Sequence, residues 1–236
     1  MKLIKRFSTV HTTSSPNRKI DYIVIHYTAG VTSREGSALN SAIYFSTADR
    51  DVSADYTVDD VYVCQYNGDI LNRYTWHCGG SRYNTKGGTY YGKCTNRNSI
   101  GIEVCSSNST GRMQDANDAS YSFTDAVMRN TEELVVALMK QYKIPVENVI
   151  RHYDVNGKPC PGIIGYNTDS GSDSLWNSFK DRLRLKTGSS GSTSTTSGSV
   201  DKLYYVQVGA FRSVINANNC LKAAKVHFPD AFIKRF

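Results

Sequence analysis

Residues 187–199 constrain the architecture of this chain more than any other stretch, because they contain only Thr, Gly and Ser, in the order "TGSSGSTSTTSGS". A run without apolar side chains has nothing to bury and is typical of a flexible linker, whose ends lie on the order of 20 Å apart. It separates residues 1–186, which are enough for one full domain with a sizeable core, from residues 200–236. The second piece falls short of the roughly 40 residues that usually fold alone.

The composition is that of an ordinary globular protein with a basic surface. Hydrophobic residues make up 39% of the chain and charged residues 21%, and the formal net charge is +7. Such a balance favours a polyanionic partner, namely nucleic acid, an anionic membrane surface or an acidic cell-wall polymer, but it also suits a surface kept basic for solubility. The chain has no Lys/Arg-rich block of the kind found in nucleic-acid-binding tails, so we expect no nucleic-acid partner.

The N-terminal segment "MKLIKRFSTVHTTSSPNRK" predicts no secretion signal, because it lacks a continuous apolar region and a cleavage site. No segment is apolar over a length that would span a membrane, so we expect no membrane insertion. The sequence therefore predicts a protein made in the cytoplasm. Reduced thiols are the default there for the six cysteines, and a Cys78–Cys94 disulfide stays an alternative for a protein that works outside the cell.

Strand-like and helix-like patterns alternate along the N-terminal part, which is typical of an α/β fold. We expect a mixed central β-sheet flanked by helices. The expected strands cover 21–28, 53–66 with a turn at Asp59-Asp60, 99–105 and 148–153, and the expected helices cover 34–48, 124–142 and 174–186. The spacing in the last helix predicts that Leu175, Phe179 and Leu183 face the core. Ser122 with Asp125 predicts a capping box for the longest helix.

The segment "RHYDVNGKPCPG", residues 151–162, places His152 and Cys160 close together in the sequence. The prolines on both sides of Cys160 fix the backbone and remove two donors, which predicts a rigid loop, neither helix nor central strand. A catalytic zinc ion needs three protein ligands and one open position. His26, at the end of an apolar strand, is a candidate for the third ligand. Alone, each residue also has a structural interpretation, as a core histidine or a buried small thiol.

Four segments, in this order, carry a resemblance to a known family: "IVIHYTAG", "WHCGG", "NSIGIEVC" and "RHYDVNGKPCPG". Together they resemble the zinc-dependent N-acetylmuramoyl-L-alanine amidases of the type-2 amidase family, which share their fold with peptidoglycan recognition proteins and include phage endolysins. The similarity covers roughly residues 19–185. It implies a peptidoglycan hydrolase, of the endolysin or autolysin kind, that cleaves the amide between N-acetylmuramic acid and L-alanine of the stem peptide.

The resemblance also implies the roles of individual residues. His26, His152 and Cys160 match the family's zinc ligands. Two imidazoles and a thiolate leave a fourth position for a water molecule, whose pKa falls to about 7 on zinc. A site of this kind supplies a nucleophile at neutral pH.

Four further residues match positions near the metal or the substrate in this family. Lys158 would stabilise the oxyanion of the reaction, although a lysine on a solvated loop is the ordinary interpretation. Tyr56 would orient the water or the tetrahedral oxygen. Glu103 would act as general base or orient the lysine, with a structural carboxylate paired with Arg151 as the alternative. His77 resembles a histidine that lines the substrate groove.

The C-terminal sequence "LYYVQVGAFRSVINANNCLKAAKVHFPDAFIKRF" predicts a βαβ segment, with strands at 203–209 and 231–235 and a helix at roughly 213–226. It resembles the first half of a SPOR-type peptidoglycan-binding domain. Because half a domain is too short to fold alone, we expect a homodimer formed through residues 201–236. A partly folded or truncated tail is the alternative.

Several functions are compatible with this pattern. The leading one is an amidase that acts on bacterial peptidoglycan and reaches the wall after lysis or through a holin-type membrane lesion. The others are a non-catalytic peptidoglycan-recognition module, an intracellular amidase that recycles wall fragments, and a regulatory protein that binds a polymerase. The complete set of ligand positions, together with Lys158, favours an enzyme. Host, stem-peptide preference and the ligand of the C-terminal segment are not encoded in a form we can interpret.

Overall fold

The computed structural model describes residues 2–83, 87–116, 118–162 and 173–188, together with 218, 220–222 and 225. The chain divides into two compact units, Met1–Gly191 and Ser192–Phe236. In the second unit the described residues are helical and fall within the predicted helix at 213–226, whereas the strands predicted at 203–209 and 231–235 lie outside the described residues. The SPOR-like βαβ arrangement therefore stays a prediction.

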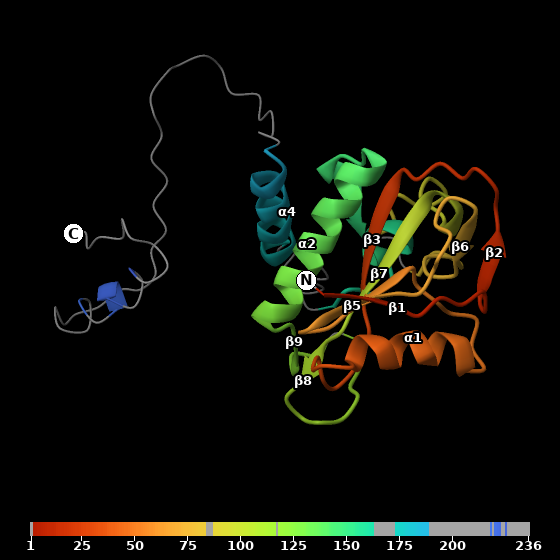
Figure 1. The fold of residues 1–236 in the computed structure, drawn as a ribbon. Helices are drawn as coiled ribbons and strands as arrows, with labels where there is room; N and C mark the ends of the chain where they lie inside the picture. The colour runs from red at the N-terminus through yellow and green to blue at the C-terminus, as the bar shows by residue number, and fades with distance from the viewer. Residues whose placement is uncertain are drawn as a thin grey trace, which may run out of the picture. The chain divides into compact units, whose positions relative to one another are not determined.

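A six-stranded sheet forms the centre of the first unit, in the order β1-β5-β4-β7-β3-β10 (Figure 1). Its strands are β1 (Lys2–Lys5), β5 (Tyr62–Gln65), β4 (Tyr56–Val58), β7 (Ser99–Val104), β3 (Tyr22–Tyr27) and β10 (Val149–Arg151). The β4–β5 pair is antiparallel and every other neighbouring pair is parallel. This confirms the predicted mixed sheet and the strands expected at 21–28, 53–66 and 99–105, whereas the strand expected at 148–153 covers only Val149–Arg151.

Four helices and some shorter elements surround the sheet in the described part of the first unit. The helices are α1 (Ser37–Thr47), α2 (Asp125–Tyr142), α3 (His152–Asn156) and α4 (Ser174–Thr187). Two small antiparallel pairs join β2 (Thr12–Ser14) to β6 (Arg73–Thr75) and β8 (Ser107–Asn108) to β9 (Tyr121–Ser122), and the 3-10 turns are η1 (Asn96–Asn98) and η2 (Val146–Asn148). The helices predicted at 34–48, 124–142 and 174–186 are confirmed. Among the described residues, no helix combines the length and the apolar composition that crossing a membrane requires.

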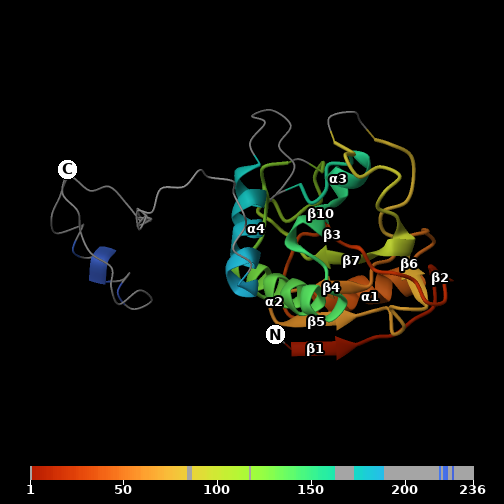
Figure 2. The same cartoon turned by 90° about the horizontal axis from the view of Figure 1, so that it is seen from above.

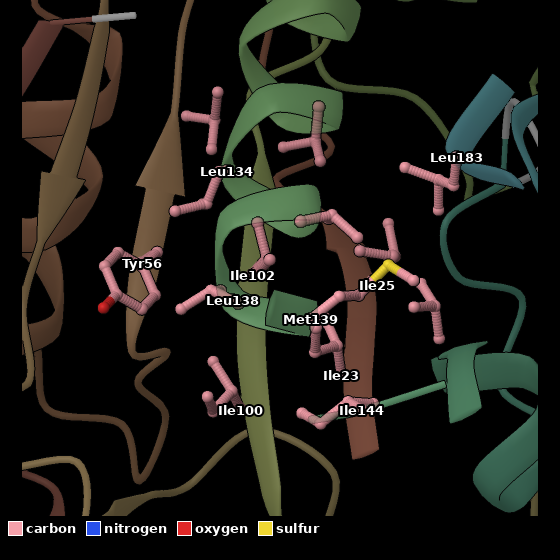
Figure 3. Packing of buried hydrophobic residues seen from close by; sticks show 14 of the residues in the cluster. Ile23, Ile25, Tyr56, Ile100, Ile102, Leu134, Leu138, Met139, Ile144 and Leu183 are labelled. Carbon is pink, nitrogen blue, oxygen red and sulfur yellow. The ribbon is translucent and has the colours of Figure 1, made fainter. Parts of the chain in front are cut away.

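The two faces of the sheet carry different side chains, because successive residues of a strand point to opposite faces. We call the face covered by α2 and α4 the core face. On it, the isoleucines of β3 and β7 pack against leucines of α2 (Figure 3). Labelled there are Ile23, Ile25, Ile100, Ile102, Leu134 and Leu138. Hydrophobic burial of this cluster is the main force that holds the helices on the sheet.

We call the opposite face the site face. Over β4 and β5 it is covered by α1, through a second cluster that contains Ala42, Phe45 and Tyr66. Beside β3 and β10 it is covered by Val155 of α3, which packs with Val24 and with neighbouring cysteines. Figure 2 shows α3 next to β10 and β3. Helices α2 and α4 thus cover the core face. Helices α1 and α3 cover only parts of the site face, and the carboxyl end of β3 lies between them.

The segment predicted as a loop at 151–162 begins instead with a short helix. Residues His152–Asn156 form α3, which ends at Gly157 in the left-handed conformation, with φ of 84°. Only after this glycine do Pro159 and Pro161 restrict the chain. A proline prevents helix only at its own position and just before it, so the residues ahead of Gly157 are free to be helical.

The start of α2 also differs from the prediction. The predicted capping residue, Ser122, belongs to strand β9. Instead, Thr124 caps the helix, because its hydroxyl accepts a hydrogen bond of 3.1 Å from the backbone N–H of Val127. Ser and Thr are both favoured capping residues, and the β8–β9 pairing, which includes Ser122, leaves Thr124 as the cap.

The inward face of α4 is rotated relative to the prediction. Leu175 is 58% exposed, whereas Trp176, Phe179 and Leu183 are buried. Trp176 stacks on Phe179 at 5.3 Å between ring centroids, and the Arg151 guanidinium lies 5.4 Å from the Trp176 ring. Trp176 is therefore the first core residue of this helix, and Leu175 is not.

We expect Trp176→Ala to lower the free energy of unfolding by about 3–5 kcal/mol, because it leaves a cavity against Phe179. The matched substitution Leu175→Ala should change it by less than about 0.5 kcal/mol, because that side chain is largely in solvent. Urea denaturation of both variants measures the difference. Equal destabilisation by the two substitutions would contradict the orientation of α4.

Candidate metal centre

Two of the three candidate ligands lie at the carboxyl ends of neighbouring parallel strands, and the third lies on the segment that follows α3. His26 is the fifth residue of β3, and His152 follows directly after β10, its parallel neighbour. Cys160 lies on the segment after α3, which turns back so that its carbonyl oxygen accepts a hydrogen bond of 2.9 Å from the Tyr153 N–H. Parallel strands end at the same edge of a sheet, so residues far apart in the sequence meet there.

The ligand atoms of these three residues are spaced as a metal ion requires. One ligand atom from each lies within 4.8 Å of the others, and Nδ1 of His26 is 3.7 Å from Sγ of Cys160. Tetrahedral zinc with Zn–N of about 2.0–2.1 Å and Zn–S of about 2.3 Å places N and S about 3.6 Å apart. All three side chains are buried. The His–His–Cys cluster can therefore hold a metal ion.

His152 provides an independent indication that a ligand belongs here. Both of its ring nitrogens are buried, and neither has a hydrogen-bond partner in the described part of the chain. A buried polar atom without a partner costs about 1–3 kcal/mol, so native proteins rarely leave two on one side chain. A metal ion at the cluster would satisfy one of them.

Burial sets the protonation of the candidate ligands. It lowers the pKa of His26 well below its usual value, helped by the neighbouring His152. It also lowers the pKa of His152, to about 3. Both imidazoles are thus neutral and able to bind a cation. Burial raises the pKa of the Cys160 thiol, so a metal ion has to displace the thiol proton, and metal affinity rises with pH.

Glu103 lies beside His26 on the same face of the sheet, because the two residues are paired in the β3–β7 register. Its Oε2 atom is buried and has no hydrogen-bond partner in the described structure. Burial raises its pKa to about 7, although the positive charge of Lys158 acts in the opposite direction. In the described chain, the carboxylates that Arg151 binds are those of Asp154 and Asp173, so the structural pairing with Glu103 is wrong.

Lys158 is exposed and precedes Cys160 by two residues. Its charge lowers the pKa values of Glu103 and His152, which places its ammonium group within electrostatic reach of the cluster. The backbone around it is held by a hydrogen bond of 3.0 Å from its N–H to the Asn156 side chain. Lys158 therefore stands at the open, solvent-facing side of the buried ligands.

The structure does not bring Tyr56 to this site. Tyr56 is paired with Ile102 in the β4–β7 register, so its side chain points to the core face, away from Glu103. Figure 3 shows its ring on the side of the sheet where Leu134 and Leu138 pack. Burial there raises its pKa. The prediction that Tyr56 lies near the metal is therefore wrong, because the alternation of side chains along the strand places Tyr56 on the core face.

His77 lies close to the candidate ligands. It is buried behind His26, with its Nδ1 atom 3.1 Å from Nε2 of that residue. Its other nitrogen lies 3.2 Å from the Ser99 hydroxyl. Its expected role in lining a substrate groove stays a prediction. The sequence does not mark Ser99 as a functional residue, because a serine at the start of a strand carries no signal of its own.

The cysteines other than Cys160 do not join the cluster. All six are free thiols in the structure. Cys78 and Cys94 lie together in the apolar cluster of α3 and β3 on the site face. The expectation of reduced thiols agrees with this arrangement, and a Cys78–Cys94 disulfide is not formed.

Comparison with known proteins identifies the family. Residues 16–163 match the family described as N-acetylmuramoyl-L-alanine amidase, and this range contains all three candidate ligands. The chain belongs to this family. A related solved amidase structure, the catalytic domain of XlyA, aligns with a TM-score of 0.54 and 27% identity, over 78% of this chain and 99% of that chain. The first unit therefore has the fold of an endolysin amidase domain.

Curated amidases are similar over a comparable range. The N-acetylmuramoyl-L-alanine amidase CwlA of Bacillus subtilis (strain 168) is 33% identical over 144 residues, which cover 61% of this chain and 43% of that protein. The amidase XlyB of the same strain is 32% identical over 202 residues, 84% of this chain and 53% of that protein. This amidase chain thus spans about half the length of the curated relatives it matches.

Glu103 makes the stability of the metal-free amidase depend on pH. Its folded-state pKa of about 7 lies above its ordinary value of 4.5, so its contribution to stability is present below pH 4.5 and is lost as pH rises through 7. Glu103→Gln removes this loss. We expect the free energy of unfolding of the variant to exceed that of the wild type by about 2–3 kcal/mol at pH 8, and to equal it at pH 4.

Urea denaturation in the presence of a chelator, at both pH values, measures this difference. Glu147→Gln is the control, because Glu147 is exposed on the surface. A gain of the same size at pH 4 and pH 8 would show that Glu103 does not titrate as its burial requires.

Proposed function

We propose that this chain is a zinc-dependent peptidoglycan hydrolase that cleaves the amide between the lactyl group of N-acetylmuramic acid and L-alanine of the stem peptide. The observation that carries the proposal is the buried cluster of His26, His152 and Cys160, with both nitrogens of His152 unpartnered, inside an amidase-family domain. Curated relatives named N-acetylmuramoyl-L-alanine amidases support the substrate and the bond. Its place of action is then the bacterial cell wall.

The donor set of the cluster suits zinc. Two neutral imidazoles and one thiolate are typical zinc ligands, and three protein ligands leave one position open, as in catalytic rather than structural sites. When bound, zinc supplies a Lewis acid that polarises an amide carbonyl and lowers the pKa of a water molecule. Burial of all three side chains keeps bulk water from competing for the ligands.

Glu103 is the best placed group to move the proton. With a pKa of about 7 it can accept a proton from the attacking water and later give it up near neutral pH. The water oxygen forms a bond to the carbonyl carbon, the C–N bond breaks, and the proton passes to the departing amine of L-alanine. The products are a lactyl carboxylate and a free amino group.

Lys158 is the group that can stabilise negative charge on the carbonyl oxygen during the attack. It stands at the solvent-facing side of the cluster, and its charge already lowers the pKa values of Glu103 and Cys160. A positioned cation in a site with few water molecules contributes several kcal/mol to such a step. Tyr56, which lies on the core face, has no part in this mechanism.

A non-catalytic peptidoglycan-recognition module is the second candidate. It would need the same fold and a groove, but neither a buried carboxylate that titrates near neutrality nor a lysine beside a complete ligand set. Their presence together favours the enzyme.

We expect Cys160→Ser to lose zinc and to release free L-alanine amino groups from purified peptidoglycan at least about 100-fold more slowly, since the metal contributes several kcal/mol to the step. Zinc content by atomic absorption and amino-group release measure the two effects. Cys105→Ser is the control. Cys105 is equally buried, but it lies beside the Ser41 hydroxyl at 3.9 Å and outside the cluster.

A second variant separates metal binding from catalysis. Lys158→Gln should retain one zinc ion, while kcat falls by about 10²–10³-fold. A wild-type protein that binds zinc and releases no amino groups from several wall types would point to the recognition module. A wild-type protein that binds no zinc would refute the centre.

The C-terminal segment is proposed to bind the wall and to dimerise the enzyme through residues 201–236. Sedimentation at micromolar concentration should give about twice the chain mass of 26.2 kDa. A chain ending at residue 191, the end of the first compact unit, should sediment as a monomer. A monomeric full chain would refute the dimer.

A further inference from the structure

A row of hydrogen bonds runs from the segment before β7 to the candidate metal centre. The Ser99 hydroxyl lies 2.5 Å from the Thr95 carbonyl oxygen, and the His77 Nε2 atom lies 3.2 Å from that hydroxyl oxygen. The His77 Nδ1 atom then lies 3.1 Å from Nε2 of His26. The side chains of Ser99, His77 and His26 are buried. The row therefore connects a backbone carbonyl to the candidate ligand His26 through two side chains that are shielded from water.

The carbonyl at one end, together with a neutral His77 ring, sets the direction of every hydrogen bond in the row. A carbonyl oxygen only accepts, so the Ser99 hydroxyl donates to Thr95, and its oxygen accepts from the Nε2–H of His77. A neutral imidazole carries one N–H, so Nδ1 of His77 has to be an acceptor. The Nε2–H of His26 therefore donates the hydrogen bond to Nδ1 of His77. His26 is left with an unprotonated Nδ1, and this atom faces Sγ of Cys160 at 3.7 Å.

We propose that His77 is a positioning residue, which fixes the tautomer of His26 so that Nδ1 of His26 is the metal-binding atom. The inference rests on the proposed zinc function and deepens it. Metal-bound imidazoles usually donate their second N–H to a carboxylate, a carbonyl or a water molecule. In this chain the acceptor is a second imidazole, whose own tautomer is set by Ser99 and, through it, by Thr95.

The space for the His77 ring is created by a glycine. A Cβ atom at Gly101 would lie 2.5 Å from Cγ of His77, closer than any side chain can approach, so only glycine admits the ring against β7. The backbone on either side is held as well. The side-chain oxygen of Asn96 accepts hydrogen bonds from the N–H groups of His77 and Cys78, at 3.0 and 2.7 Å. The ring is thus fixed in place and edge-on to His26, at 89° between the ring planes.

The tautomers can be observed directly by ¹⁵N NMR of the histidine rings in the full chain, without and with zinc. We expect protonated Nε2 and unprotonated Nδ1 on both His26 and His77 in the metal-free protein, and a zinc-induced shift at Nδ1 of His26. A proton on Nδ1 of His77, or a zinc-induced shift at Nε2 of His26, would overturn the proposal.

Two substitutions at residue 77 test the function of the hydrogen bond. His77→Leu removes the acceptor, and we expect zinc affinity, measured by chelator competition, to fall by about 10–100-fold. His77→Asn places an amide oxygen near the position of Nδ1 and should restore most of that affinity. Equal zinc affinity in His77→Leu and the wild type would overturn the proposal, and so would equal losses in the two variants.

A third variant leaves every side chain of the row in place. Gly101→Ala displaces the His77 ring, so we expect the same loss of zinc affinity as in His77→Leu, together with an altered absorption spectrum of the cobalt-substituted protein. An unchanged affinity and spectrum in Gly101→Ala would count against the proposal, even if His77→Leu fails to fold.

These readouts are independent of peptidoglycan cleavage. Zinc bound through Nδ1 of His26 without release of amino groups would refute the proposed activity alone. Cleavage of the wall by a protein whose zinc is bound through Nε2 of His26 would refute this inference alone. A wild type that binds no zinc would refute both the proposed activity and this inference.

Discussion

The parallel register of β10, β3 and β7 is the constraint on which the rest of this structure depends. It pairs Ile25 with Ile102 on the core face and His26 with Glu103 on the site face. Because side chains alternate along a strand, a slip by one residue would turn the histidine and the carboxylate into the apolar core and the isoleucines toward the metal centre. The large apolar cluster on the core face therefore fixes the positions of the polar groups that would carry out the chemistry.

Burying polar groups on the site face is costly unless each has a partner. Most of them do, since His26 is bonded to His77 and His77 to Ser99. The exceptions, the nitrogens of His152 and one oxygen of Glu103, lie at the same place. Unpaired groups gathered at one point of the site face are what a preorganised site requires, because no reorganisation is then needed when a cation and a substrate arrive.

The same burial explains the division of labour among the site residues. It keeps both candidate imidazole ligands neutral and holds the Glu103 pKa near 7, so one physical effect prepares metal binding and proton transfer together. Lys158 is exposed and provides the compensating positive charge from outside. The family membership and the XlyA catalytic-domain structure agree with this arrangement, over a range that covers the first unit.

The sequence by itself determined the fold class, most strands and helices, and the three candidate ligands, because ordered motifs and the alternation of apolar runs survive without any knowledge of packing. Only the tertiary structure decided which way side chains point. All residues of β4 are buried, so no period-two pattern indicated that Tyr56 faces the core. Leu175 and Trp176 are adjacent and both apolar, and the docking of α4 against Arg151 selected the tryptophan as the buried residue. Likewise, the contact of His77 with His26 joins residues 51 positions apart, through a space left by Gly101 that local sequence patterns do not reveal.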